Sequence, residues 1–574
     1  MALQYLAIVT PPSPRAEPPP SPRDETLRPV FTSDALSIFA NEQAIVLPGN
    51  KGAIVGHLFN RCLPAQRVTE LDDATARQII ATSGRSLLAQ FWGGYVAFLV
   101  IDDHVVIMRD PSGALPCYHT TQTKLQALAS DIKTLIDEIL PRPSINWDGL
   151  FLHLAGIEFK RPQTALANIS ELLAGFRLNA KRAEHQEEVW SPWNFVTPTR
   201  QTDTLAEHQV KAVIDSSVDA WAGAFSSVGL SLSGGLDSSV VAAALRDRVG
   251  TLSLLNLASD DAEGDERHFA RLAADAVGAP LTEVFYDPND VDFTRSTSAY
   301  LPRPIYSALA MADIAVKTRL AATNSLGAWM SGLGGDNVFC IMSTPVALLD
   351  RLSTEGLSPS LFRTFGDVLR LTGRSIPEIV RDTWRARMRY KGRFNWIPET
   401  DFLNKTRMSA APVRFEHPWL IPPAGTPIGK VEHVASLLRI QGSIDGFERS
   451  GPPLINPLLS QPIVEACLAI PTWKWCVGGR NRSVARAAYA AILPPRLLNR
   501  RSKGGPNGFA FRLMNAHRAT LKSLLVDGIL VENGILDGGA IAAAFKDDAP
   551  LSANNCFHLS FLAEAETWCR HWQA

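Results

Sequence analysis

The feature that most constrains this chain is a glycine- and serine-rich stretch, Ser231-Leu-Ser-Gly-Gly-Leu-Asp-Ser-Ser239. An apolar run at 228–232 predicts a buried strand before it, and apolar residues at helical spacing within 239–249 predict a helix after it. A strand, a glycine turn and a helix N-terminus together form an anion site, because free backbone N–H groups and the helix dipole face the turn. No lysine follows the glycines, which excludes the G-x-x-x-x-G-K-[ST] loop. A carboxylate at this place, Asp237, indicates a Mg²⁺ ion between it and a phosphate.

This stretch resembles the pyrophosphate-binding loop, S-G-G-x-D-S, of the PP-loop ATP pyrophosphatases. The alternative is a serine-rich helix cap after a glycine turn, which is disfavoured because the strand, glycines, aspartate and serines all occur in the order of that loop. The resemblance implies that ATP is cleaved between its α and β phosphates and that AMP is left on a carboxylate or carbonyl oxygen. It also implies that ATP is held by Leu232, Ser233, Gly234, Gly235, Leu236, Asp237, Ser238 and Ser239.

Length and composition set the broad class. A chain of 574 residues predicts two domains or more. Lys+Arg 56 against Asp+Glu 57 is balanced, which argues against nucleic acid or a membrane surface as a general partner. The cysteines form no C-x-x-C pair, which favours reduced thiols over disulfides or a zinc site. No apolar run approaches membrane-spanning length and no signal pattern opens the chain, so we expect a soluble, cytoplasmic protein.

Strand-like runs dominate the N-terminal half. Leu3 to Thr10 predicts a strand, and the proline-rich 11–29 that follows predicts a disordered surface loop rather than a recognition motif. Further strands are predicted at 44–47 and 53–59. Phe91 to Ile101 predicts a buried strand that pairs as a hairpin with 105–108.

The segment Arg109-Asp-Pro-Ser-Gly-Ala-Leu-Pro-Cys-Tyr118 resembles the R-D-x-x-G-x-x-P-L-Y segment of the glutaminase domain in glutamine-dependent asparagine synthetases. Thr164 to Leu178 resembles that domain's closing strand. The resemblance implies that residues 1–195 form an Ntn-hydrolase-like αββα sandwich.

The N-terminus departs from that family's pattern. Such a glutaminase carries its nucleophile as a cysteine exposed by removal of Met, and its free α-amine acts as the base. Here the second residue is Ala2, and Cys62 and Cys117 lie far from the terminal amine. We therefore expect no glutamine hydrolysis and interpret the domain as a retained scaffold.

A proline- and threonine-rich stretch at 190–204 predicts the interdomain linker, so residues 196–574 form the second domain. Strands at 251–257 and 281–285 alternate with a helix at 265–277, which predicts a doubly wound α/β domain with a parallel sheet. Ligands of such sheets bind at the carboxyl ends of the strands, which places Asn256 near the adenine. Asp265 and Glu266 are interpreted as helix N-terminal charges rather than catalytic groups.

A second glycine motif is Ser331-Gly-Leu-Gly-Gly-Asp-Asn337, which resembles the S-G-x-G-G/S-D-E segment of the asparagine synthetase superfamily. The resemblance implies that Ser331 and Gly332 line the nucleotide and that Asp336 is a second Mg²⁺ ligand. Two carboxylates from two loops suit a hard cation that bridges phosphates. Asparagine synthetases have Glu where this chain has Leu333, and β-lactam synthetases have a tyrosine there.

The third motif comprises Arg480 to Tyr489, 493–496 and Arg500-Arg-Ser-Lys-Gly-Gly505. It resembles the superfamily's K-x-x-L-R-x-A…L-P…R-x-K-x-G tail, which implies that Lys503 contacts the pyrophosphate and the adenylate as a catalytic cation. Arg482 falls on a second basic position that faces phosphate. The other arginines are interpreted as surface charge: Arg480, Arg496, Arg500 and Arg501.

Taken together, the superfamily motifs, the missing glutaminase cysteine, Leu333 and the length resemble the lasso peptide cyclases, asparagine-synthetase-like macrolactam synthetases. The resemblance implies ATP and Mg²⁺ as cofactors, with Asp237, Asp336 and Lys503 as the catalytic residues. Its implied partners are a precursor core peptide and a cysteine protease that removes the leader. A pocket between the domains would hold the peptide, walled by 301–306 and 442–457.

Three alternatives remain open at this point. The first is a small-molecule ligase of the β-lactam synthetase kind. The second is an ammonia-dependent asparagine synthetase without glutaminase activity. The third is a non-catalytic scaffold for precursor and protease, against which the intact Ser233, Asp237, Asp336 and Lys503 argue.

Overall fold

The structure is a computed structural model. The residues it describes are 2–10, 22–102, 104–121, 126–183, 185–196, 203–261, 264–305, 307–390, 392–410, 413–444, 451–500, 504–505, 507–546 and 551–574.

The N-terminal half folds into two antiparallel sheets that pack face to face. The first has the order β11-β9-β10-β1-β3-β2 and the second the order β13-β12-β8-β7-β5-β4, with β6 also paired to β5. The strands of the first sheet are Ile169–Glu171 (β11), Tyr118–Thr120 (β9), Gln126–Ala129 (β10), Tyr5–Val9 (β1), Leu36–Ala40 (β3) and Arg28–Thr32 (β2). Those of the second are Gln186–Glu188 (β13), Phe176–Asn179 (β12), His104–Arg109 (β8), Phe91–Ile101 (β7), Gly52–Asn60 (β5), Ile45–Val46 (β4) and Arg67–Val68 (β6).

Side-chain alternation along the strands builds this sandwich. In β7, Val96 and Phe98 face the first sheet and pack with Tyr5, whereas Tyr95 and Leu99 face outward. Helices α1 (Asp73–Ala81) and α2 (Arg85–Gln90) cover the outer face of the second sheet. Helices α3 (Ile132–Glu138) and α4 (Trp147–Leu154) cover the outer face of the first. The predicted αββα architecture is confirmed.

Two local predictions in this half are wrong. Thr164 to Leu178 is not one closing strand, because Gly175, with φ +76°, turns the chain between β11 in one sheet and β12 in the other. The proline-rich loop was predicted to extend to Pro29, but Arg28 and Pro29 already belong to β2, and Leu27 is buried. Residues 11–21 of that loop lie outside the described residues.

The C-terminal half is organised by a parallel sheet in the order β16-β15-β14-β17-β18. Its strands are Leu281–Phe285 (β16), Leu252–Ala258 (β15), Val228–Ser231 (β14), Ala328–Met330 (β17) and Leu454–Ile455 (β18). One face packs on α8 (Ala310–Asn324), and the other on α5 (Asp203–Gly223), α6 (Leu236–Ala244) and α7 (Arg267–Val277). From β14 the chain adds β15 and β16 on one side of the sheet, and then β17 and β18 on the other side. This makes the carboxyl end of β14 the switch point where such sheets bind ligands.

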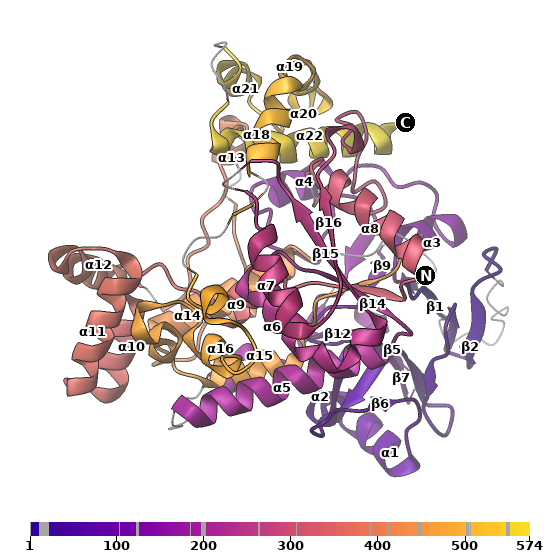
Figure 1. Cartoon of the computed structure of the whole chain (residues 1–574). Helices are drawn as coiled ribbons and strands as arrows, with labels where there is room; N and C mark the ends of the chain where they lie inside the picture. The colour runs from indigo at the N-terminus through magenta and orange to yellow at the C-terminus, as the bar shows by residue number, and fades with distance from the viewer. Residues whose placement is uncertain are drawn as a thin grey trace.

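The remaining helices pack around this sheet and on the sandwich (Figure 1). Helices α10 to α12 project away from the sheets at the left of the view. The bounds are Gly335–Val338 (α9), Val346–Glu355 (α10), Pro359–Thr372 (α11), Ile376–Arg389 (α12), Lys405–Ala410 (α13), Ile428–Gly442 (α14), Gln461–Ala469 (α15), Ser483–Ala488 (α16), Pro495–Leu498 (α17), Asn507–Ala516 (α18), Arg518–Val526 (α19), Ile529–Glu532 (α20), Gly538–Ala544 (α21) and Ala553–Gln573 (α22).

The C-terminal half contacts both outer faces of the sandwich. Trp221 of α5 packs edge-on against Phe59 and Trp92 of the second sheet, with ring centroids 5.1 and 6.3 Å apart. Helices α18 to α22 share a core with Leu6 and Tyr118 of the first sheet. The last sandwich strand ends at Glu188 and α5 begins at Asp203, and the boundary at residue 195 stays a prediction. Among the described helices, none combines the length and the apolar character needed to span a bilayer.

Candidate active site

The glycine turn after β14 is held in a conformation that only small residues permit. Gly234 has φ +72°, and a Cβ on it would lie 2.7 Å from the backbone N of Ala270 in α7. Gly235 is the N-cap of α6, which begins at Leu236 rather than at the predicted Ser239. Asp237, Ser238 and Ser239 therefore lie in the first turn of α6. Its free N–H groups and dipole favour an anion.

The serine hydroxyls of this turn have different roles. Ser239 is fully buried and donates to Gly235 O at 2.7 Å, so its hydroxyl stabilises the turn rather than facing a ligand. Ser238 Oγ lies 3.2 Å from Ser233 Oγ, and Ser233 is exposed at the open side of the turn. Leu232 is buried, and its N–H donates to Leu255 O in β15 at 2.7 Å. Among these residues, Ser233 is the hydroxyl placed to meet a phosphate.

Two carboxylates from the two glycine loops converge on one cation. Nη1 of Arg482 lies 3.0 and 2.9 Å from the carboxylate oxygens of Asp237 and 2.5 Å from Oδ1 of Asp336. Arg482 adopts φ +60° at the N-cap of α16, which aims its side chain between the two loops. The carboxylates of Asp237 and Asp336 thus lie close together. Arg482, which was expected to face phosphate, forms an ion pair with both of them.

The close approach of the loops depends on glycine. A Cβ on Gly332 would lie 2.4 Å from the backbone N of Ser238. A Cβ on Gly335 would lie 2.4 Å from Cγ of Asp237. The spacing of the two carboxylates is therefore set by the packing of Gly332 on the backbone of the first loop and of Gly335 on the Asp237 side chain.

The carboxylate pair fits a divalent cation. Among the residues that the structure describes, no group of three or more His, Cys, Asp or Glu side chains gathers as a metal site. Mg²⁺ is commonly bound by one or two protein carboxylates together with substrate phosphates and water, so two converging aspartates beside an anion site match its needs. The contact of both aspartates with a single guanidinium nitrogen shows that one cation can reach both.

Asn256 and Ser331 tie the site to the neighbouring strands. Asn256 is buried and donates from Nδ2 to Leu232 O at 2.7 Å, beneath the glycine turn. Ser331 donates from Oγ to Asn456 Oδ1 at 2.7 Å, past the end of β18. Leu333 follows on the exposed side of the second loop, 40% accessible to solvent.

Sequence reasoning missed a clamp behind the glycine turn. Arg500 was assigned to surface charge, and that assignment is wrong: its side chain is only 10% exposed. It pairs with the buried carboxylate of Glu266, donates to Gly234 O at 3.2 Å and lies 4.0 Å over the ring of Phe269. Glu266 also accepts from the N–H of Gly504. The carboxylate interpreted only as a helix N-terminal charge therefore joins α7, the glycine turn and the third motif.

The other basic residues of the third motif differ in their surroundings. Arg496 is exposed, as expected, and Arg480 contacts Asn499. Lys503, the predicted catalytic cation, and Arg501 lie outside the described residues.

Residues near the N-terminus are buried in the first sheet of the sandwich. Ala2 is buried, and its carbonyl accepts from Asn41 Nδ2 at 3.0 Å. The Tyr5 hydroxyl is buried and donates to Pro116 O at 3.0 Å. Burial raises the pKa of the Cys117 thiol to about 11, so it remains protonated near neutral pH and is a weak nucleophile.

A parallel sheet with a phosphate-binding turn and two carboxylates at its switch point defines an ATP-utilising α/β domain. It is joined here to a glutaminase-like sandwich. Comparison with protein families gives the same two parts. The asparagine synthase model matches residues 209–410 and 451–570, more than half of the chain, so the chain belongs to the asparagine synthase family. The glutamine amidotransferase domain model matches residues 68–191.

No curated protein matches the chain. Two solved structures have 9% sequence identity and a TM-score of 0.19. One is the allosteric regulatory enzyme of purine biosynthesis, with 45% of this chain and 68% of that chain covered. The other is glutamine phosphoribosylpyrophosphate amidotransferase from B. subtilis complexed with ADP and GMP, with 49% and 59% covered.

Proposed function

We propose that this member of the asparagine synthase family is an ATP-dependent lasso peptide macrolactam synthetase. The observation that carries the ATP chemistry is the convergence of Asp237 and Asp336 beside the N-terminus of α6. The choice of substrate rests on two departures from the family's pattern. Ala2 stands where the glutaminase cysteine would be, and an exposed Leu333 stands where asparagine synthetases carry Glu.

In the proposed reaction, a side-chain carboxylate oxygen of an Asp or Glu in the core peptide attacks the α-phosphorus of ATP. The bond to the bridging oxygen breaks, and an acyl-adenylate and pyrophosphate result. The α-amine of the peptide then attacks the acyl carbon, loses a proton and displaces AMP, which closes an isopeptide ring. The N–H groups of α6 and the Ser233 hydroxyl bind phosphate. Asp237 and Asp336 would hold Mg²⁺, which neutralises phosphate charge.

The amine step requires little base catalysis. An α-amine has a pKa of about 8, so a useful fraction is neutral near pH 7. This is consistent with Leu333, which has no acid–base function. The larger task is to hold the peptide tail in place during ring closure. Such preorganisation can supply effective molarities of roughly 10⁵ M or more.

The proposed enzyme works with a protease and a peptide substrate, and its N-terminal domain has no catalytic role. The α-amine is freed by a leader-removing cysteine protease, and the core peptide binds between the two halves of the chain. The N-terminal domain acts as a scaffold without glutaminase activity, and the reaction takes place in the cytoplasm.

The test is a cyclisation assay with purified protein, ATP, Mg²⁺ and a library of linear peptides. Each peptide has a free N-terminal amine and a single Asp or Glu at a varied position. We expect AMP release and a product that has lost one water. Library members with an acetylated N-terminus provide the matched control, since they can be adenylated but not cyclised.

Other assay results would favour one of the three alternative functions. Amide formation from aspartate and ammonia would establish an ammonia-dependent asparagine synthetase. ATP–pyrophosphate exchange with free amino acids but with no peptide would favour a β-lactam synthetase-like ligase. Absence of any exchange would favour a non-catalytic scaffold. Ammonia release from glutamine would refute the assignment of the N-terminal domain.

A further inference from the structure

The N-terminal domain contains a second charged cluster, outside the candidate active site. Glu171 of β11 is fully buried, and its carboxylate contacts three cations. Arg109 Nη1 donates to Oε1 at 2.8 Å, Arg303 Nη2 to Oε2 at 2.7 Å, and Lys160 Nζ to Oε1 at 3.3 Å. Burial alone would raise the pKa of Glu171, but the three cations hold it below its usual range. An ionised carboxylate in the core is a firm anchor, because its loss would leave three largely buried cations without the anion that they share.

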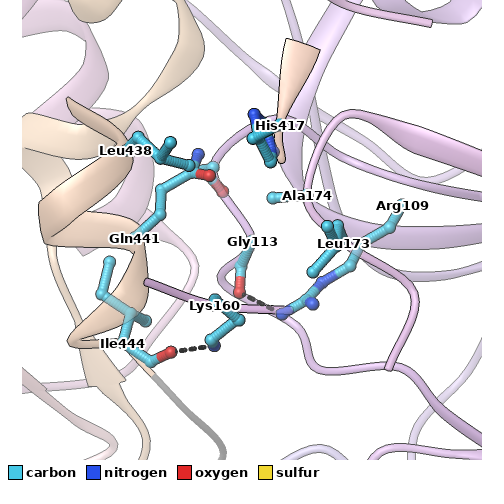
Figure 2. Close-up of a pocket in the computed structure, with 10 residues that line it drawn as sticks. Arg109, Gly113, Lys160, Leu173, Ala174, His417, Leu438, Gln441 and Ile444 are labelled. Atoms are coloured by element: carbon cyan, nitrogen blue, oxygen red, sulfur yellow. Dashed lines mark hydrogen bonds between the residues drawn. The ribbon is translucent and has the colours of Figure 1, made fainter. Parts of the chain in front are cut away.

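The three cations come from different parts of the chain. Arg109 belongs to the sandwich, and its other donors bind carbonyls of the same domain, including Gly113 O at 2.8 Å. Arg303 belongs to the C-terminal half, in the segment that follows β16. Lys160 also donates to the carbonyl of Ile444, just past the end of α14 (Figure 2). One carboxylate therefore links the sandwich to two separate segments of the C-terminal half.

The first of these segments, 298–305, rests directly on the sandwich. The carbonyl of Pro302 accepts from Ala165 N at 3.0 Å. The carbonyl of Pro304 lies 2.5 Å from Nε2 of the buried His153. Arg303, between these two prolines, is the residue of the segment that reaches Glu171.

The second segment, 441–444, is packed as closely. A Cβ on Gly442 would lie 2.0 Å from Glu158 O, so the two backbones touch. Gln441 donates from Nε2 to Pro111 O at 2.9 Å. The cavity between this segment and Lys160 measures only about 20 Å³, room for a single water (Figure 2). The contact is a packed interface rather than a ligand pocket.

The helix that ends in the second segment contacts the candidate active site: Ser436 O of α14 accepts from Nδ2 of Asn337, the neighbour of Asp336, at 2.8 Å. The segment 298–305 lies between β16 and α8 in the chain, which leaves β16 at the carboxyl edge of the parallel sheet. The chain after Ile444 leads to β18, whose Ile455 O accepts from Ser331 N at 3.2 Å. Residues 411–450 fall between the two blocks that match the asparagine synthase model, so segment 441–444 lies outside the matched family core and segment 298–305 lies within it.

We propose that Glu171 is a positioning residue for the peptide substrate: it fixes segments 298–305 and 441–444 on the inactive domain, so that they border the peptide beside the nucleotide. The inference rests on the proposed function. It assigns a task to the domain that lacks the glutaminase nucleophile. The domain supplies an ionic anchor rather than ammonia.

The experiment measures hydrogen–deuterium exchange of the full-length protein by mass spectrometry, without substrate. Arg303→Met should raise exchange about tenfold or more in 298–305, and Lys160→Met should do so in 436–444. Glu171→Gln should raise both, and the two single-cation variants keep the test available if it fails to fold. The control is Arg61→Met, which removes another ion pair between the two halves, 2.7 Å from Glu465. It should change neither segment.

A second measurement uses a library peptide that the wild type cyclises. Lys160→Met and Arg303→Met should raise the peptide KM about tenfold while the KM for ATP changes little. Unchanged exchange in both segments, or a uniform rise across the chain, would overturn the positioning role. Localised exchange with an unchanged peptide KM would overturn the link to substrate. If no peptide is cyclised, the proposed function fails, yet the exchange result still decides whether Glu171 holds the two segments.

Discussion

The contact between the two glycine loops offers a sharp test of the site, through Gly332→Ala. The added Cβ would lie 2.4 Å from Ser238 N, and ordinary contacts begin near 3.4 Å, so the loops must separate by about 1 Å. The clash is with backbone in the first turn of α6, which cannot rotate away as a side chain can. Overpacking of this kind costs about 1–3 kcal/mol. We expect that strain to fall on the phosphate-binding turn and on the spacing of Asp237 and Asp336.

The assay is calorimetric binding of a non-hydrolysable ATP analogue with Mg²⁺, together with thermal unfolding. Gly332→Ala should weaken binding about tenfold or more, equivalent to ~1.4 kcal/mol, and lower turnover by roughly 10²-fold, since a 1 Å displacement can have that effect. The matched control is Gly250→Ala, where an added Cβ meets nothing within 4 Å. If Gly332→Ala bound the analogue as tightly as the wild type, the loops would not set the geometry of the site.

Further predictions concern the two aspartates, the clamp behind the glycine turn and the buried histidines. Asp237→Asn and Asp336→Asn should each abolish pyrophosphate release while far-UV circular dichroism stays native, and wild-type release by either would exclude it as a Mg²⁺ ligand. Glu266→Gln should raise the KM for ATP and speed proteolysis near Gly504, because Arg500 and the Gly504 N–H lose their anionic partner. Unchanged values would show that the charge of Glu266 does not contribute to the site. The free energy of unfolding should fall as pH drops from about 6.5 toward 4, by up to ~1.4 kcal/mol per pH unit per histidine. The reason is that histidines bind protons in the unfolded state over this range, whereas the buried rings of the folded state stay neutral. Urea unfolding at pH 7 and 5 measures this, and a flat profile would contradict the buried neutral rings. Burial lowers the pKa to about 3 or 4 at His57, His119, His153, His417 and His433.

The apolar patterns predicted strands well and missed the start of the central helix. β7 and β16 occur at their predicted residues, because a run of buried side chains carries its own signal. The start of α6 was placed at Ser239 because its first turn, from Leu236, is mostly polar. That turn supplies groups to the site instead of to the core. A functional helix N-terminus therefore lacks the apolar periodicity by which helices are found.

Glycine motifs were informative about the site because their spacing reflects backbone contacts. The sequence brought Asp237 and Asp336 together only through resemblance, and the structure adds the physical cause, the packing of Gly332 and Gly335 on the first loop. Arg500 could not be assigned in this way. A buried arginine requires a carboxylate partner, and its partner Glu266 is remote in sequence, so no local pattern distinguishes it from surface charge.

The Arg109-Asp110 motif has a structural role that does not depend on glutaminase chemistry. Arg109 is only 2% exposed, and its guanidinium binds the carbonyls of Gly113, Leu115 and Leu172 as well as Glu171. It therefore closes the turn of its own motif and fixes the edge of the first sheet, and neither task involves glutamine. Removing it would leave Glu171 with fewer cations and several carbonyls unpaired in the core. The motif is therefore explained by the packing of the sandwich alone, and its presence is no evidence for glutaminase activity.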